Sequence, residues 1–219
     1  WLTAVALLLA LPLGVSAAIY LSEYARDNWL TRTINIAIVN LAGVPSIVYG
    51  ILGLTAFARM FGAFGTNVED AITLGSEESL FFLRIPFGSS VLAGGLTLML
   101  VILPVVIIAT QEALRAVPGS LRAGAFALGA TRWQTVWGIT LPAAVPGIMT
   151  GAILAMSRAI GEAAPILVLG APLMVLESPA NLMSEFTVLP MQIFNWAGRA
   201  KASFQEIAAA AIIVQLAVL

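Results

Sequence analysis

Apolar runs long enough to cross a lipid bilayer recur along this chain of 219 residues. A membrane-spanning helix needs about 20 consecutive, mainly apolar residues. No charged residue interrupts residues 1–21, 33–58 or 85–111. Backbone polar groups in lipid must be satisfied within the chain, and these runs show no alternation with a period of two. The sequence therefore predicts an all-α, polytopic transmembrane helical bundle.

We expect one domain over residues 1–219, truncated at both ends because the chain begins and stops inside apolar runs. One further span would precede Trp1 if the amino terminus of the longer protein is cytoplasmic. The expected spans cover about residues 1–21, 34–57, 88–111, 147–170 and 206–219, with a cytoplasmic loop at 112–142.

Composition excludes several classes of function. Only 10% of the residues are charged, against roughly 25% in soluble domains. The chain has no Cys and no His, which removes disulfides, thiol nucleophiles, His-based triads and most zinc sites, so no metal site is expected. The formal net charge of −1 gives no reason to expect a nucleic acid partner, and lipid is the expected surroundings.

Loop charge predicts the orientation of the spans. Residues 113–157 contain three Arg and no acid, whereas residues 60–83 contain four acids and no base. The excess of positive charge in cytoplasmic loops places the first stretch inside and the second outside. A charge-balanced, solvated loop is expected around Glu23, Arg26, Asp27 and Arg32.

Pro45 and Pro104 lie inside the spans expected at 34–57 and 88–111. A proline removes a backbone donor and bends a helix. Either static curvature or a hinge in a pathway-lining helix would explain these residues, so both are hinge candidates.

The expected loop at 112–142 resembles a docking segment. Leu121, Ala125 and Leu128 are spaced as one face of a short helix, and small residues around them keep that helix slim. Such a helix could dock in the groove of a partner or lie on the lipid surface.

The same loop resembles the cytoplasmic motif of ABC importer membrane subunits, in which a Gly is followed after nine residues by Ile-x-Leu-Pro. Gly129, Ile139, Leu141 and Pro142 match that spacing, whereas Ala123-Gly124-Ala125 stands where the motif has Glu-Ala-Ala. The resemblance implies a type I importer permease (MetI-like) fold and a helix that couples to an ATPase. The implied coupling residues are Ala123, Gly124, Ala125, Leu128, Gly129, Ile139, Leu141 and Pro142.

Four further segments are similar to the permeases of phosphate-specific ABC importers. They are residues 18–24, 41–50, 112–118 and 158–165, and the Gly-Glu-Ala-Ala-Pro sequence that ends the last one resembles the PstA-type subunit. The resemblance implies a multi-pass protein of a bacterial or archaeal plasma membrane. Its implied partners are a PstC-type sister permease, two ATPase subunits and an extracytoplasmic phosphate-binding protein.

No phosphate-binding loop for a nucleotide is present. Such a loop ends in Gly-Lys-Ser/Thr, and the only Lys here, Lys201, is followed by Ala202. We therefore expect no enzyme activity and no cofactor in this chain, with ATP and Mg²⁺ bound by the partner ATPase.

Arg158 and Glu162 form the candidate substrate pathway. They lie four residues apart near the middle of the span expected at 147–170, so they share one helix face. A charge in the membrane is costly unless it is paired or faces a cavity. The pair could lock helices together, or Arg158 could bind a passing anion, because its planar donors suit phosphate oxygens.

The predicted function is thus a permease subunit that moves inorganic phosphate by alternating access. Alternatives are a permease for sulfate, molybdate or phosphonate, an ion-coupled secondary transporter or channel, and a purely structural membrane partner. A channel or secondary transporter would need more membrane-embedded charges than one pair.

Overall fold

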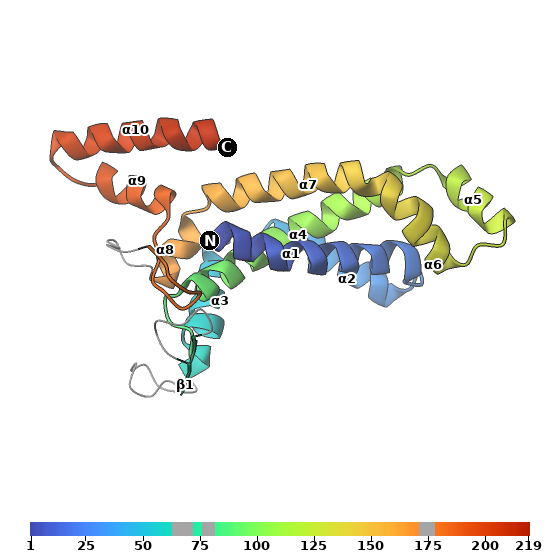
Figure 1. Ribbon diagram of the computed structural model, residues 1–219, viewed down its shortest axis with the longest axis horizontal. Helices are drawn as coiled ribbons and strands as arrows, with labels where there is room; N and C mark the ends of the chain where they lie inside the picture. Colours follow the sequence, from blue (N-terminus) through green and yellow to red (C-terminus); the bar gives the residue numbers. More distant parts are fainter. Residues whose placement is uncertain (63–71, 76–81, 171–177) are drawn as a thin grey trace. The chain divides into compact units, whose positions relative to one another are not determined.

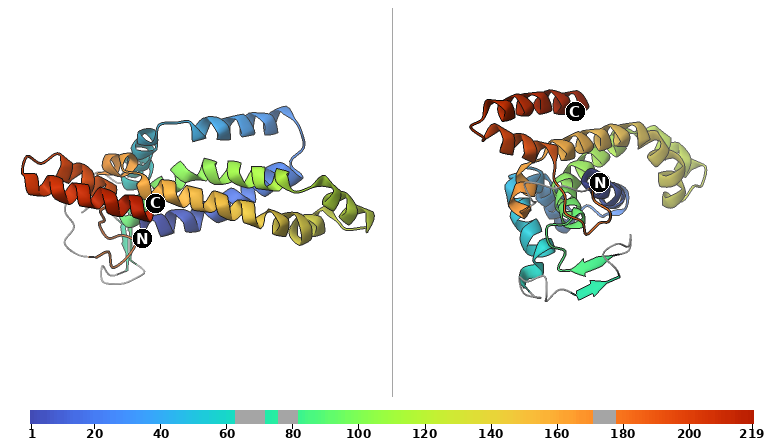
Figure 2. Two further views of the ribbon diagram at one scale, coloured as in Figure 1. Left: turned by 90° about the horizontal axis from the view of Figure 1, so that it is seen from above. Right: turned by 60° about the vertical axis from the view of Figure 1, so that its left-hand side comes forward.

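The computed structural model describes residues 1–62, 72–75, 82–170 and 178–219. Most of these residues are helical (Figure 1), which confirms the predicted all-α membrane class. A small antiparallel sheet pairs β1 (Ile72–Leu74) with β2 (Leu83–Ile85), as Figure 2 shows. The α-helices are α1 Leu2–Ile19, α2 Trp29–Ala42, α3 Ser46–Gly53, α4 Val91–Ala116, α5 Gly119–Ala127, α6 Arg132–Thr135, α7 Leu141–Gly161, α8 Ala164–Leu169, α9 Leu189–Ala197 and α10 Ala202–Val218.

Three helical stretches of the described chain are long and apolar enough to cross a membrane. They are Leu2–Tyr24 with 23 residues, Val91–Ala116 with 26 and Arg132–Gly161 with 30. At about 1.5 Å per residue, each exceeds the bilayer core of about 30 Å. The first and third are continuous because π-helical turns, Tyr20–Tyr24 and Val136–Thr140, extend α1 and join α6 to α7.

The span expected at 34–57 is not one straight helix. α2 and α3, the latter extended by a π-helical turn to Ala58, meet at a bend of 99°. Pro45 has no backbone N–H, and it disfavours helical backbone at Val44 before it. Asn28 begins α2 earlier than expected, because its side chain accepts a hydrogen bond from the Thr31 backbone N–H at 2.9 Å.

The span expected at 147–170 is also displaced. The helix begins at Arg132, inside the loop expected at 112–142, and ends at Gly161. Thr131 and Gln134 form a capping box that starts it. Within residues 112–142, α4 continues to Ala116, and α5 is the short helix expected around Leu121 and Ala125.

The chain divides into two compact units. The first comprises residues 1–6, 45–100 and 157–219, and the second comprises residues 7–44 and 101–156. The acidic residues that suggested an outside loop, Glu69, Asp70, Glu77 and Glu78, lie outside the described residues.

In the first unit, α3 packs closely against α8 and α4 through glycines. A Cβ atom added at Gly50 would lie 2.7 Å from Pro165 Cα, and one added at Gly53 would collide with the Thr97 hydroxyl. Phe186 is fully buried and lies over Gly94 of α4. These close approaches give the unit a core in which small residues decide the helix spacing.

In the second unit, α4 packs against both α1 and α7. A Cβ at Gly14 of α1 would lie 2.7 Å from Val106. Gly147 and Gly151 of α7 face Ala113 and Ala109, with added Cβ atoms only 2.8 and 2.5 Å from the alanine methyl groups. The Gly-x-x-x-Gly spacing thus produces close helix contact here.

Candidate functional site

Arg158 and Glu162 form an ion pair at the carboxyl end of α7. Arg158 Nε lies 3.6 Å from Glu162 Oε1, and their side chains are 40% and 17% exposed. The pair was expected near the middle of a span, whereas the structure places Arg158 in the last turn of α7, which ends at Gly161. A cation in the last turn of a helix is favoured by the helix dipole.

Tyr49 of α3 is buried, and its hydroxyl lies within electrostatic range of the Arg158 guanidinium. Gly50, the next residue, touches Pro165. The pair therefore stands next to the contact between α3 and α8. Sequence reasoning missed Tyr49, although it belongs to the segment 41–50 that resembles phosphate permeases.

The two hinge candidates differ in their surroundings. Pro45 stands at the 99° break between α2 and α3. Pro104 lies inside the uninterrupted α4. Their role as hinges stays a prediction.

α5 is a short helix between the ends of α4 and α6 (Figure 1). The expectation of one outward apolar stripe is wrong for Ala125, which is 4% exposed, whereas Leu128 is 91% exposed. Leu121 and Phe126 are also exposed. The outward surface of α5 and its end therefore carries Leu121, Phe126 and Leu128, with Ala125 turned inward.

Gly129 ends α5 in a left-handed conformation, with φ of +82°. The Ala130 N–H donates to the Ala125 carbonyl oxygen at 3.1 Å, and the Gly129 N–H donates to that of Phe126 at 3.0 Å. These two bonds form a Schellman motif, in which glycine is preferred because it tolerates a positive φ. The motif leaves Leu128 projecting from the end of the helix.

The residues expected to couple to an ATPase do not form one cluster. Ala123, Gly124, Leu128 and Gly129 are exposed on α5 and its end, whereas Ala125 is buried. Ile139 lies in the π-helical turn, and Leu141 and Pro142 begin α7. The Ile-x-Leu-Pro portion of the motif therefore belongs to the long helix that follows the α5 segment.

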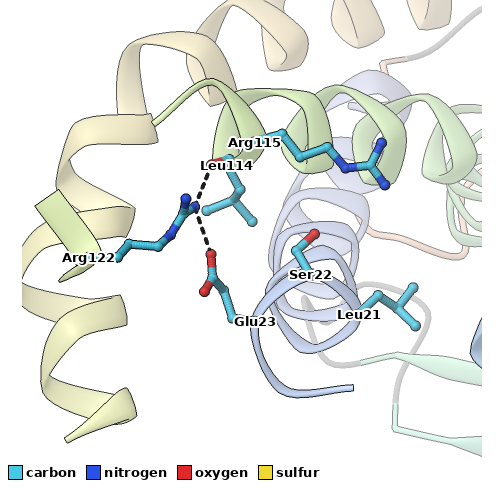
Figure 3. Close-up of a pocket in the computed structure, with 6 residues that line it drawn as sticks. All are labelled: Leu21, Ser22, Glu23, Leu114, Arg115 and Arg122. Atoms are coloured by element: carbon cyan, nitrogen blue, oxygen red, sulfur yellow. Dashed lines mark hydrogen bonds and ion pairs between the residues drawn. The ribbon is translucent and has the colours of Figure 1, made fainter. Parts of the chain in front are cut away.

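A polar cavity of about 440 Å³ lies beside α5. Figure 3 shows Arg122 pointing across it to Glu23, with Arg115 directed away. Arg122 Nη2 lies 3.0 Å from Glu23 Oε1, and the two side chains are 24% and 15% exposed. The expected solvated loop is therefore wrong for Glu23, which lies in the π-helical turn that extends α1. No local pattern joins two residues 99 positions apart.

Comparison with known proteins identifies a family. The family described as binding-protein-dependent transport system inner membrane component matches residues 10–219. The probable ABC transporter permease protein YqgH of Bacillus subtilis is 36% identical over 188 residues, 85% of this chain and 55% of that protein.

Several relatives carry the name of a phosphate transport system permease protein. PstC of Haemophilus influenzae is 36% identical over 162 residues, 72% of this chain and 50% of its own length. PstA 1 of Mycobacterium tuberculosis is 38% identical over 165 residues, 75% of this chain and 46% of its own. The chain spans about half the length of the curated relatives it matches.

Proposed function

We propose, because the chain belongs to the family of binding-protein-dependent transport system inner membrane components, that it is a permease subunit of an ATP-driven importer of inorganic phosphate. In this proposal it translocates phosphate by alternating access and hydrolyses no ATP itself. The observation that supports the substrate class is the ion pair of Arg158 and Glu162. The Arg158 side chain in this pair remains 40% exposed.

The guanidinium of Arg158 suits an oxyanion. It is always charged, and its planar donors match phosphate oxygens. The Glu162 carboxylate contacts the Arg158 guanidinium at 3.6 Å, which is longer than a strong charged hydrogen bond. A phosphate could therefore take over donors of Arg158 while Glu162 keeps the side chain oriented. The names of two relatives, phosphate transport system permease proteins, support phosphate over other oxyanions.

The exposed apolar residues of α5 support docking to an ATPase subunit. Leu121, Phe126 and Leu128 project from a helix whose amino-terminal neighbour, α4, and carboxyl-terminal neighbour, α6, both belong to long apolar helices. A short helix presenting apolar anchors fits a groove in a partner. In the proposed complex, two ATPase subunits bind ATP and Mg²⁺, and α5 receives their movement.

The remaining partners are a sister permease and an extracytoplasmic phosphate-binding protein, in a bacterial or archaeal plasma membrane. The Gly-Glu-Ala-Ala-Pro sequence at 161–165 favours a PstA-type subunit with a PstC-type sister. Relatives of both names match with similar identity, 36% and 38%. Purification of the assembled complex with a tag on this chain would identify the sister subunit.

Transport by the purified complex tests the proposal. The full-length protein would be reconstituted with its co-purifying subunits and binding protein in lipid vesicles, and the uptake of radiolabelled phosphate would be measured. We expect uptake that requires ATP and that excess sulfate, molybdate or phosphonate does not inhibit. Inhibition by one of these anions would reassign the substrate. Uptake driven by an ion gradient without ATP would identify a secondary transporter instead.

A further inference from the structure

Arg122 of α5 joins two helix ends that are far apart in the sequence. Its Nη2 donates to Glu23 Oε1 at 3.0 Å and to the Leu114 carbonyl oxygen at 2.7 Å. Its Nη1 donates to the Val117 carbonyl oxygen at 3.1 Å. Figure 3 shows the guanidinium between the end of α4 and the turn that carries Glu23. One side chain thus connects α5, α4 and the π-helical turn at the end of the first long helix.

Arg122 binds carbonyl groups at the carboxyl end of α4. A positive charge is favourable beside the last carbonyls of a helix, and the Leu114 carbonyl oxygen also accepts a hydrogen bond from the Val117 N–H at 3.3 Å. Leu114 and Val117 are buried, so water reaches them poorly. A planar guanidinium can donate to several acceptors in a fixed geometry, whereas a Lys ammonium or a Gln amide cannot match all three.

A second arginine, Arg132, also contacts Glu23. Its backbone carbonyl oxygen accepts a hydrogen bond from Arg132 Nη1 at 3.4 Å. Arg132 begins the helix that follows α5. The turn at residues 20–24 is therefore contacted by a residue within α5 and by a residue just after it.

Burial of apolar side chains contributes little to the position of α5. Ala125 is the single buried residue of this fully described helix. Arg122 lies in the first turn of α5, and only Val117 and Pro118 separate α4 from α5. The contacts of Arg122 therefore supply much of what prevents α5 from turning relative to the end of α4.

We propose that Arg122 is a positioning residue that transmits movement of α5 to the end of α4 and to the turn at Tyr20–Tyr24. This inference rests on the proposed function, in which an ATPase moves α5. The Arg122 contacts make α5 and the two helix ends move as one body. Without them, the backbone on either side of α5 absorbs the movement, so ATP is hydrolysed with less transport.

The ratio of phosphate transported to ATP hydrolysed tests this role in the reconstituted whole complex. Arg122→Gln is expected to lower that ratio roughly tenfold while ATP hydrolysis continues. Arg122→Lys is expected to recover part of the ratio, since an ammonium reaches some of the acceptors. The matched control is Arg32→Gln, which removes an exposed arginine whose only ion pair among the described residues, with Asp27, spans 4.0 Å.

A charge exchange separates a simple ion pair from the three-way contact. Glu23→Arg combined with Arg122→Glu restores opposite charges, but a carboxylate at position 122 cannot donate to the two carbonyl groups. We expect the ratio to stay low, and its recovery would overturn the proposal. A ratio for Arg122→Gln equal to that of Arg32→Gln, with less complex assembled, would also overturn it by showing a purely structural role. Absence of ATP-driven uptake in the unmodified complex would instead refute the proposed function.

Discussion

Gly50 of α3 lies against the backbone of Pro165 in α8. A methyl group at Gly50 would come 2.7 Å from Pro165 Cα and 2.9 Å from its carbonyl oxygen. Backbone atoms cannot move aside as a flexible side chain can. The contact next to the Arg158 and Glu162 pair therefore depends on the absence of a side chain at position 50.

Gly50→Ala is expected to separate α3 from α8 and to lower the free energy of unfolding by about 1–3 kcal/mol, as overpacking does. Thermal unfolding of the detergent-solubilised protein would measure the change. Gly138→Ala is the control, because nothing lies within 4 Å of a Cβ added there. Equal melting temperatures for the two variants would contradict the close contact.

Gly151→Ala is expected to be destabilising by a similar overpacking cost of about 1–3 kcal/mol. An added methyl would lie 2.5 Å from Ala109 Cβ but 3.8 Å from Ala109 Cα. Adding Ala109→Gly removes the opposing methyl, so the double variant should regain most of the lost stability. If the second substitution lowers the melting temperature further, α4 and α7 do not meet at these residues.

Arg158→Gln is expected to reduce phosphate uptake at least tenfold at normal protein levels, because the anion loses its charged donors. Glu162→Gln should have a smaller effect, since the guanidinium stays in place. The exchange Arg158→Glu with Glu162→Arg restores the ion pair but moves the cation by one helical turn. Recovery of uptake in that double variant would show that the pair is structural. Normal uptake by Arg158→Gln would refute its role in binding the anion.

Leu128→Asp is expected to weaken binding of the ATPase subunit, because a carboxylate in an apolar groove is costly to desolvate. Co-purification of the ATPase with the tagged permease would measure this. Leu128 is 91% exposed, so the permease itself should stay folded. Ile72→Asp, which changes an exposed apolar residue of β1, is the matched control. Equal amounts of ATPase with both variants would argue against docking through the end of α5.

Several features of the candidate site could be read from local sequence. Arg158 and Glu162 form the ion pair expected from their spacing of four. Gly129 was predicted from a motif, and its φ of +82° supplies the physical reason for glycine there. Each of these features depends on neighbours within about one or two helical turns.

The sequence predicted the helix boundaries less accurately than these local features. The pattern predicts one span at 34–57 with curvature or a hinge at Pro45, and the structure breaks it there into two helices at a bend of 99°. It also predicts a span at 147–170, but the capping box at Thr131 starts the helix much earlier. Hydrophobicity reports which residues suit lipid, whereas helix ends depend on caps and on backbone geometry.

The sequence alone determined that this chain is a helical membrane protein, because long charge-free runs have few other ways to satisfy their backbone in lipid. Only the tertiary structure decided which distant residues meet. Arg122 binds Glu23, 99 residues away, and Gly50 lies against Pro165. Such contacts arise from how helices pack against one another, and the residues around each partner do not encode that packing.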